Sequence, residues 1–264
     1  MRSPEERREL EQRVQEVSSW YHAIDLGDGI QTPGPFHMAS FLSHYEFPDR
    51  MDGMRVLDVG ASNGYFSFEF ERRGAEEVVA LDLPTWGSHD WTPRYRESYA
   101  AKEQAERDYI DREAMRAGFD LVKEALGSRR VRKVEMAIYD IAPETLGRFD
   151  FVFSGSMLMH VRDPILGIQR LRSIAKDTAR LVISISTTMP DVNEPLARFC
   201  GEWDQCNWWQ MNPRCLKDAL SCCDLEVLGE GTLFHLTDRS GQFDDLTFVA
   251  RARPMGRHKS RGSA

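Results

Sequence analysis

The chain has 264 residues, 41% of them apolar, and a formal net charge of −8. That length allows one large α/β domain, or a domain with an added lid, and the apolar share allows a substantial core. The acidic balance argues against a broad nucleic-acid surface, which needs clustered Lys and Arg. No apolar run approaches membrane-spanning length, and the charged residues 1–13 lack the apolar centre of a signal sequence, so we expect a soluble cytoplasmic protein without a membrane partner.

The first predicted element is a helix that begins just after Ser3. Ser3 can cap this helix, and Glu6 completes a capping box. The segment that follows, residues 20–34, is rich in turn and aromatic residues, and its Asp28-Gly29 pair predicts a tight hairpin. Residues 1–50 therefore have two interpretations that stay open, a lid over a site or a brace for the domain.

Residues 54–66 predict a buried strand, a tight turn and the start of a helix, and are the most informative stretch of the chain. Gly60 and Gly64 bracket the turn, where glycine allows unusual dihedral angles and lets a ligand approach the backbone. The helix over 65–73 would offer free N–H groups and the positive end of its dipole to that ligand.

The glycine spacing indicates which ligand binds. In the dinucleotide pattern Gly-x-Gly-x-x-Gly, counted from Gly60, the other two glycines would fall at Ser62 and Tyr65, and Tyr65 is too bulky there. Asp58 before the turn suits a ligand with an ammonium group, and Asp82, after the next strand, can accept both ribose hydroxyls. The pattern predicts S-adenosylmethionine, which carries an amine and a sulfonium. The alternative is a structural turn in a nucleotide-binding or inactive α/β domain.

Strands and helices alternate along the remaining chain. This alternation predicts a doubly wound, mostly parallel sheet whose ligand lies at the carboxyl ends of the strands. We expect the main domain to cover 51–254 and a disordered basic tail to cover 255–264. The predicted strands are 134–141, 149–153, 181–185, 225–227, 233–236 and 246–250. We expect one or two helices over 95–126, further helices over 165–175 and 213–223, and loop and cap over 199–209.

Cysteines and acids give no sign of a metal. The cysteine count is odd and no Cys-x-x-Cys spacing occurs, so reduced, partly buried thiols are expected. Asp25, Asp28 and Asp191 lack ligand spacing and suit turns and caps. The five cysteines are Cys200, Cys206, Cys215, Cys222 and Cys223.

Three segments together resemble a known family. They are Trp20-Tyr-His-x-Ile-Asp-Leu-Gly-Asp-Gly-x-x-Thr-Pro-Gly34, Val56-Leu-Asp-Val-Gly60 and Phe68-Glu-x-Glu-Arg-Arg-Gly-Ala75. The chain is similar to class I S-adenosylmethionine-dependent methyltransferases, and within them resembles the tRNA wobble-uridine (carboxymethoxyuridine) methyltransferases. The likeness covers roughly residues 18–185, with a weaker part over 212–227. It implies a Rossmann-like, seven-stranded sheet with an N-terminal helical lid.

The resemblance also implies roles for individual residues. The methionine part of the cofactor would lie near Asp58, the ribose at Asp82, the adenine beside Asp140, and the sulfonium above a segment that begins at Ser154. The complete set of predicted cofactor-binding residues is Asp58, Gly60, Ala61, Ser62, Gly64, Tyr65, Asp82, Leu83, Asp140, Ile141 and Ser154.

Two positions depart from the tRNA enzymes, which use a carboxylated form of the cofactor. A tyrosine and an arginine help to hold the extra carboxylate in that family, whereas this chain has Met159 and, near the second position, Asp245. A carboxylate facing these side chains would be unpaired or repelled. The departures predict the plain cofactor and methyl transfer, and favour a small-molecule acceptor over tRNA.

A hydroxyl acceptor must lose a proton during methyl transfer, so a base is needed near it. His160 and His22 are the candidate bases, and each could instead be a structural, hydrogen-bonded histidine. Aromatic and apolar side chains at the rim could stack on a flat acceptor or face the sulfonium. The predicted substrate-binding residues are Trp20, Tyr21, Met159, Trp208 and Trp209.

Three functions stay open from the sequence. The leading hypothesis is methyl transfer to an oxygen or nitrogen atom of a small molecule, such as an aromatic specialised metabolite. The second is RNA methylation of the wobble-uridine type, and the third is a non-catalytic nucleotide-binding module with no acceptor-sized cavity. The sequence does not decide the oligomeric state, and a homo-oligomer stays open. The RNA hypothesis predicts one continuous basic groove formed by Arg94, Arg96, Arg129, Arg130 and Arg132.

Overall fold

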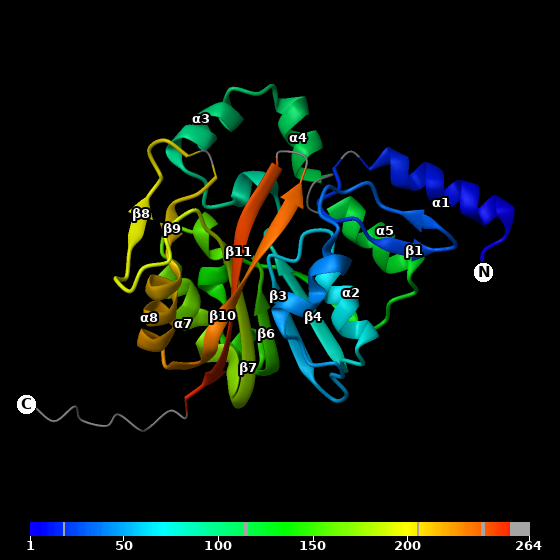
Figure 1. Ribbon diagram of the computed structural model, residues 1–264. Helices are drawn as coiled ribbons and strands as arrows, with labels where there is room; N and C mark the ends of the chain where they lie inside the picture. Colours follow the sequence, from blue (N-terminus) through cyan, green and yellow to red (C-terminus); the bar gives the residue numbers. More distant parts are fainter. Residues whose placement is uncertain (18, 113–115, 205, 239–240, 254–264) are drawn as a thin grey trace, which may run out of the picture.

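The structure is a computed structural model that describes residues 1–253 apart from 18, 113–115, 205 and 239–240. A seven-stranded sheet crosses the molecule (Figure 1). Its strands in chain order are β3 (Arg55–Val59), β4 (Glu77–Asp82), β5 (Val131–Glu135), β6 (Phe149–Ser154), β7 (Ala175–Ser186), β10 (Leu225–Asp238) and β11 (Gly241–Ala252).

The strand order across the sheet is β10-β11-β7-β6-β3-β4-β5. Strands β3 to β7 run parallel to one another, and β11 runs antiparallel to both of its neighbours. The chain therefore starts the sheet near its middle, winds outward to β5 and returns to build the other half. This confirms the predicted doubly wound, mostly parallel, seven-stranded fold.

Helices cover both faces of the sheet. Alternate strand residues point to opposite faces, so Val56 enters the core beneath α2 and α5, while Leu57 enters the core beneath α7 and α8. Figure 1 shows these two helix pairs on opposite sides. The helices are α1 (Pro4–Glu16), α2 (Tyr65–Arg72), α3 (Pro93–Ala100), α4 (Gln104–Arg112), α5 (Gly118–Ala125), α6 (Pro143–Leu146), α7 (Pro164–Ile174) and α8 (Pro213–Cys222), with 3-10 turns η1 (Met38–Tyr45), η2 (Trp86–Ser88), η4 (Ile138–Asp140) and η5 (Leu158–His160).

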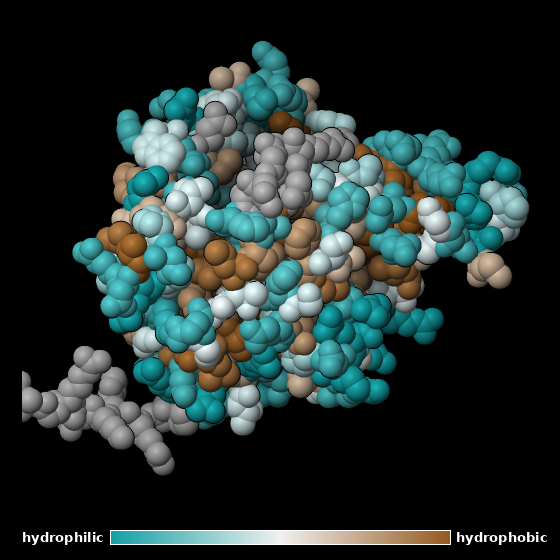
Figure 2. All heavy atoms as spheres, viewed as in Figure 1, coloured by the Kyte–Doolittle hydropathy of each residue, from teal (hydrophilic) through white to brown (hydrophobic). Residues whose placement is uncertain are grey.

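The N-terminal segment forms as its local sequence predicts. The Ser3 hydroxyl accepts from the Glu6 backbone and the Glu6 carboxylate accepts from the Ser3 backbone, which completes the capping box. Strands β1 (Asp25–Gly27) and β2 (Ile30–Gln31) form the hairpin expected at Asp28-Gly29. Helix α1 buries its apolar stripe against α5, and its outward face in Figure 2 is mainly hydrophilic.

Three expectations for single elements were wrong. The third strand was expected over 134–141 but is Val131–Glu135. It ends at Glu135 because its neighbour β4 ends at Asp82, the register partner of Glu135, and the chain then turns into η4. The stretch expected to hold one or two helices contains α3, α4 and α5. The three last strands expected are instead two long ones, β10 and β11. The segment expected to be loop and cap does form the loop of a short hairpin, between β8 (Ala197–Phe199) and β9 (Trp209–Met211).

The expected basic tail, 255–264, lies outside the described residues. Within the described part of the chain, no helix is both long and apolar enough to cross a membrane.

Candidate functional site

The turn between β3 and α2 needs glycine at both of its ends. Gly60 and Gly64 have φ angles of +79° and +89°, in the left-handed region that side chains disfavour. A Cβ on Gly64 would lie 2.5 Å from the Phe68 ring and 2.9 Å from the Phe119 ring. The Gly60 N–H donates to the Leu81 carbonyl at 2.9 Å, which ties the turn to the end of β4.

Asp82 organises the loops that meet at the end of β4. One of its carboxylate oxygens accepts from the Ser62 N–H at 2.7 Å, and the other accepts from the Leu83 N–H at 2.8 Å. The side chain is buried but stands at the carboxyl end of a parallel strand, where the sequence places the ribose. Ala61, between the two glycines, donates its N–H to the Leu81 carbonyl as well.

Asp58 is a buried carboxylate without a cation beside it. It is 1% exposed, and the Ser67 hydroxyl donates to it at 2.5 Å. Burial raises the pKa of Asp58 to about 7, and repulsion from Asp82 adds to this increase. Among the described residues, no Lys, Arg or His forms an ion pair with Asp58. A ligand ammonium group would therefore stabilise the charged form of Asp58.

A second polar group here also lacks a partner. The hydroxyl of Ser154, at the end of β6, is buried and has no hydrogen-bond partner in the described part of the structure. Together with Asp58 and the open glycine turn, it fits a polar, cationic ligand such as S-adenosylmethionine. Of the residues predicted near adenine, Asp140 is exposed at the end of η4 and Ile141 is buried against the α7 side of the core.

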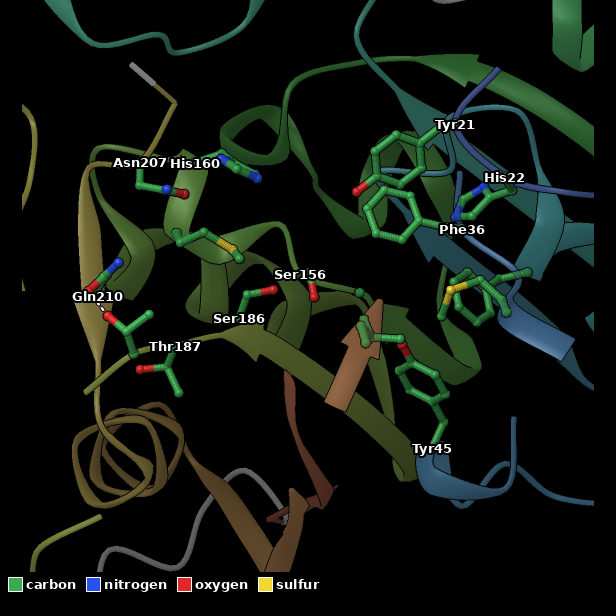
Figure 3. A pocket seen from close by; sticks show the side chains of 16 residues that line it. Tyr21, His22, Phe36, Tyr45, Ser156, His160, Ser186, Thr187, Asn207 and Gln210 are labelled. Carbon is green, nitrogen blue, oxygen red and sulfur yellow. Dashed lines mark hydrogen bonds between the residues drawn. The ribbon is translucent and has the colours of Figure 1, made fainter. Parts of the chain in front are cut away.

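A cavity of about 270 Å³ lies beside this turn. Figure 3 shows Tyr21, His22 and Phe36 on one wall and His160 and Asn207 across from them. Two consecutive residues link the cavity to the turn: Ser156 lines the cavity, and Met157 packs against Gly60, where an added Cβ would lie 3.2 Å from its Cγ. The lining residues are Tyr21, His22, Phe36, Met38, Tyr45, Phe66, Gly155, Ser156, Met159, His160, Ser186, Thr187, Thr188, Asn207, Gln210 and Leu236.

The N-terminal segment acts both as a brace and as a wall. It buries Ile24 and Leu26 in the core, and it also places Tyr21 against the cavity. The Tyr21 N–H donates to the Asn63 side chain at 2.6 Å, and Asn63 is buried within the glycine turn. Asn63 was not among the predicted site residues. The only signal for it was an amide side chain directly before Gly64.

Both candidate bases line the cavity. His22 is 4% exposed, its Nδ1 has no hydrogen-bond partner among the described residues, and burial lowers its pKa to about 3. The Nδ1 of His160 donates to the Cys206 carbonyl at 3.0 Å, and burial lowers the pKa of His160 as well. Both imidazoles are therefore neutral near pH 7, and a catalytic role for either stays a prediction.

The predicted substrate-binding residues divide into two groups. Tyr21 and Met159 line the cavity, whereas the three tryptophans do not. The indole of Trp20 donates to the Val14 carbonyl at 3.0 Å and packs in the core under α1. The other two indoles tie loops together, that of Trp208 to the Asp90 carbonyl and that of Trp209 to the Arg162 carbonyl. Tyr65, predicted beside the cofactor, is the first residue of α2, with its ring 5.6 Å from that of His22.

The floor of the cavity carries a feature that sequence reasoning missed. Asp245, on β11, is fully buried and accepts from the Ser156 hydroxyl at 2.9 Å and from the Tyr45 hydroxyl at 3.3 Å. The sequence marked Asp245 only as a departure from the tRNA enzymes. No local signal pointed to Ser156 or Tyr45, since they meet Asp245 from distant parts of the chain.

The cysteines and acids form no cluster at this site. All five cysteines are free. In the part of the chain that the structure describes, no group of three or more Cys, His, Asp or Glu side chains could hold a metal ion.

The strand order and the glycine turn after the first parallel strand define a class I, Rossmann-like methyltransferase fold. A family model described as a methyltransferase domain matches residues 37–227. The chain belongs to this family, and the expected resemblance to S-adenosylmethionine-dependent methyltransferases is confirmed.

Curated relatives match only part of the chain. The tRNA U34 carboxymethyltransferase of Pseudomonas aeruginosa is 29% identical over 144 residues, which are 54% of this chain and 36% of that protein. The magnesium-protoporphyrin O-methyltransferase of Rhodobacter capsulatus is 27% identical over 136 residues, 52% of this chain and 46% of that protein. The match thus spans less than half the length of each of these two relatives.

Solved structures share the fold over nearly the whole chain. The N-terminal domain of EvdMO1, crystallised in the presence of SAH and D-fucose, has a TM-score of 0.58 and 19% identity, and covers 96% of this chain and 100% of that one. The 1,6-didemethyltoxoflavin-N1-methyltransferase of Burkholderia thailandensis has a TM-score of 0.51 and 16% identity, and covers 96% and 92%. At these identities the likeness shows the fold.

Proposed function

We propose that this enzyme transfers a methyl group from plain S-adenosylmethionine to an oxygen or nitrogen atom of a small molecule. The observation that carries the proposal is the cavity of about 270 Å³ beside the glycine turn, linked to it through Ser156 in the lining and Met157 against Gly60. The described lining residues include no Lys or Arg. They are aromatic, apolar or neutral polar side chains and two histidines with lowered pKa values. Such a lining suits a neutral, partly aromatic acceptor.

Each part of the cofactor has a residue of this chain proposed to hold it. Asp58 would pair with its amino group, Asp82 would accept the ribose hydroxyls, Ser154 would donate near the sulfur, and Asp140 and Ile141 would flank adenine. When bound, the cofactor supplies a methyl group on a positively charged sulfur, and the carbon–sulfur bond breaks with its electron pair staying on sulfur.

The remaining task of the protein is to place the acceptor and keep water out. Tyr21 and Phe36 offer aromatic faces on one wall, their rings 4.6 Å apart between centroids. Asn207 and Gln210 offer amide groups on the other wall, where they could fix the orientation of acceptor hydroxyl or amino groups (Figure 3). Holding the reacting atoms in line can by itself supply about 7–11 kcal/mol of the barrier.

Labelled S-adenosylmethionine tests the proposal directly. The full chain would be incubated with the labelled cofactor and, in parallel, with phenols, sugar hydroxyl compounds, aryl amines and total tRNA. We expect label in at least one small-molecule class and none in tRNA. Label confined to tRNA would overturn the proposal in favour of RNA methylation.

The RNA hypothesis keeps one supporting observation, the partial likeness to tRNA U34 carboxymethyltransferases. The positions of two of its arginines argue against the predicted basic groove. Arg94 lies on α3, after the carboxyl end of β4, and donates to the Trp203 carbonyl, whereas Arg132 lies at the amino end of β5 and pairs with Glu77. Since β4 and β5 are parallel, these arginines lie at opposite ends of the sheet and do not form one groove.

We expect the carboxylated cofactor to bind at least tenfold more weakly than S-adenosylmethionine, a difference of about 1.4 kcal/mol. Met159 offers an added carboxylate no hydrogen-bond donor, and the buried carboxylate of Asp245 lies under the same cavity. Competition calorimetry measures the ratio of the two affinities. In Asp245→Asn the ratio should fall. Equal binding of the two cofactors by the wild-type chain would contradict this choice.

A further inference from the structure

The carboxylate of Asp245 lies beneath the cavity and is not among the residues proposed to hold plain S-adenosylmethionine. We propose that Ser156 and Asp245 form a proton relay that takes the proton of an acceptor hydroxyl, so that the atom methylated is oxygen. This inference rests on the proposed small-molecule methyl transfer and narrows it to one class of acceptor, a phenol or an alcohol.

The geometry connects the buried carboxylate to the cavity through one hydroxyl. Asp245 is fully buried, and the Ser156 hydroxyl donates to its Oδ1 at 2.9 Å. Ser156 lines the cavity, and Figure 3 shows its hydroxyl near the middle of the lining residues. The Tyr45 hydroxyl donates to Oδ2 at 3.3 Å, so the carboxylate is held from both sides.

Ser156 is held at the boundary between the cavity and the cofactor turn. Its φ angle is +46°, an unusual value for serine, and its N–H donates to the Ser184 carbonyl at 3.1 Å. The next residue, Met157, packs against Gly60. Strained backbone of this kind persists only where the surrounding structure holds it, and such positions concentrate at active sites.

Among the residues that the structure describes, no Lys, Arg or His forms an ion pair with Asp245. Tyr45 faces it from η1, Ser156 and Ser184 face it from the β6 loop and β7, and its register partner on β10 is Phe234. The exposed His235–Asp244 pair occupies the next register position of the two strands and points to the opposite face of the sheet.

The surroundings also suit Asp245 to accept a proton. Burial raises the pKa of Asp245 to about 6, and the hydrogen bonds from Ser156 and Tyr45 keep it from rising further. The carboxylate is then mostly ionised at pH 7 to 8 but close enough to neutrality to take up a proton, which is the condition for an efficient general base.

In the proposed step, methyl transfer to the acceptor oxygen is accompanied by two proton transfers. The acceptor oxygen forms its bond to the methyl carbon with one of its electron pairs, and its O–H proton moves to the Ser156 oxygen. The proton that Ser156 held moves to Oδ1 of Asp245, which becomes a neutral carboxylic acid and later returns the proton to solvent. A neutral amine has a free electron pair and needs no base before transfer, so this relay is specific to hydroxyl acceptors.

The first test needs no acceptor. In carbon-13 NMR of the full chain labelled at its aspartate carboxyl carbons, the signal lost in Asp245→Asn should titrate near pH 6. In Tyr45→Phe that signal should titrate at higher pH, because a donor that lowers the pKa is gone. Titration near the ordinary value of about 3.9, unmoved by Tyr45→Phe, would overturn the relay.

The second test uses phenols and aryl amines with labelled S-adenosylmethionine. Asp245→Asn, and Ser156→Gly, which tolerates the positive φ, should lower phenol methylation about 10²- to 10⁴-fold. The acid limb of kcat/KM should move to higher pH in Tyr45→Phe, while the neighbouring Asp244→Asn, on the opposite face, should leave the pH profile unchanged. Phenol methylation unaffected by Asp245→Asn would overturn the relay alone. Failure to methylate any acceptor would overturn the proposed function and the relay with it.

Discussion

Asp58→Asn should weaken the binding of S-adenosylhomocysteine about thirtyfold or more, because losing one partner of a buried charge pair costs about 2–5 kcal/mol. Asparagine keeps the volume of Asp58 and can still accept from Ser67, but it cannot balance a ligand ammonium group. Calorimetry at several pH values measures the effect. The pKa of the free Asp58 carboxyl is about 7, so wild-type affinity should fall below pH 7, where binding must first release a proton.

The stability of the same variant separates lost binding from misfolding. A carboxyl whose pKa is raised on folding favours the folded state only at low pH, and that contribution is lost as pH rises through about 7. Ligand-free Asp58→Asn should therefore be more stable than wild type at pH 8, with little difference near pH 4, in thermal unfolding. A variant that binds as tightly as wild type, with the same pH dependence, would contradict the role given to Asp58.

Gly64→Ala should lower the free energy of unfolding by about 2–5 kcal/mol. A positive φ costs a side chain about 1–2 kcal/mol, and overpacking against the Phe68 and Phe119 rings costs about 1–3 kcal/mol more. Urea unfolding measures the loss. Gly229→Ala is the matched control, because Gly229 has a φ of +78° with no atom within 4 Å of an added Cβ, so only the conformational cost should appear. Equal losses in the two variants would show that packing at the turn is not tight.

Much of the geometry around the glycine turn could be predicted because its signals are local. The strand, turn and helix around Gly60 lie within a short stretch, and the glycines that bracket the turn have the positive φ angles that favour glycine. Asp58 and Asp82 end up close together because β3 and β4 are adjacent parallel strands, which the alternation of elements already indicates. The boundary of β5 was harder to predict, because it depends on where its neighbour β4 ends.

The contacts beneath the cavity could not be predicted for the opposite reason. Asp245 meets Ser156 across 89 residues of sequence and Tyr45 across 200, through an antiparallel strand inserted late in the chain. The tryptophans show a related limit. The indole of Trp20 donates its N–H to a neighbouring carbonyl, and its ring fills the core. Composition alone could not distinguish such an indole from one that stacks on a ligand.

A crystal structure of the full chain with S-adenosylhomocysteine tests the central claim most directly, that the glycine turn holds the cofactor and the adjoining cavity receives the acceptor. We expect the ligand amine against Asp58, the ribose hydroxyls on Asp82 and the sulfur facing the space beside Ser156, with the cavity between Tyr21 and His160 left open. A ligand that fills this cavity, or that binds away from the glycine turn, would contradict the account.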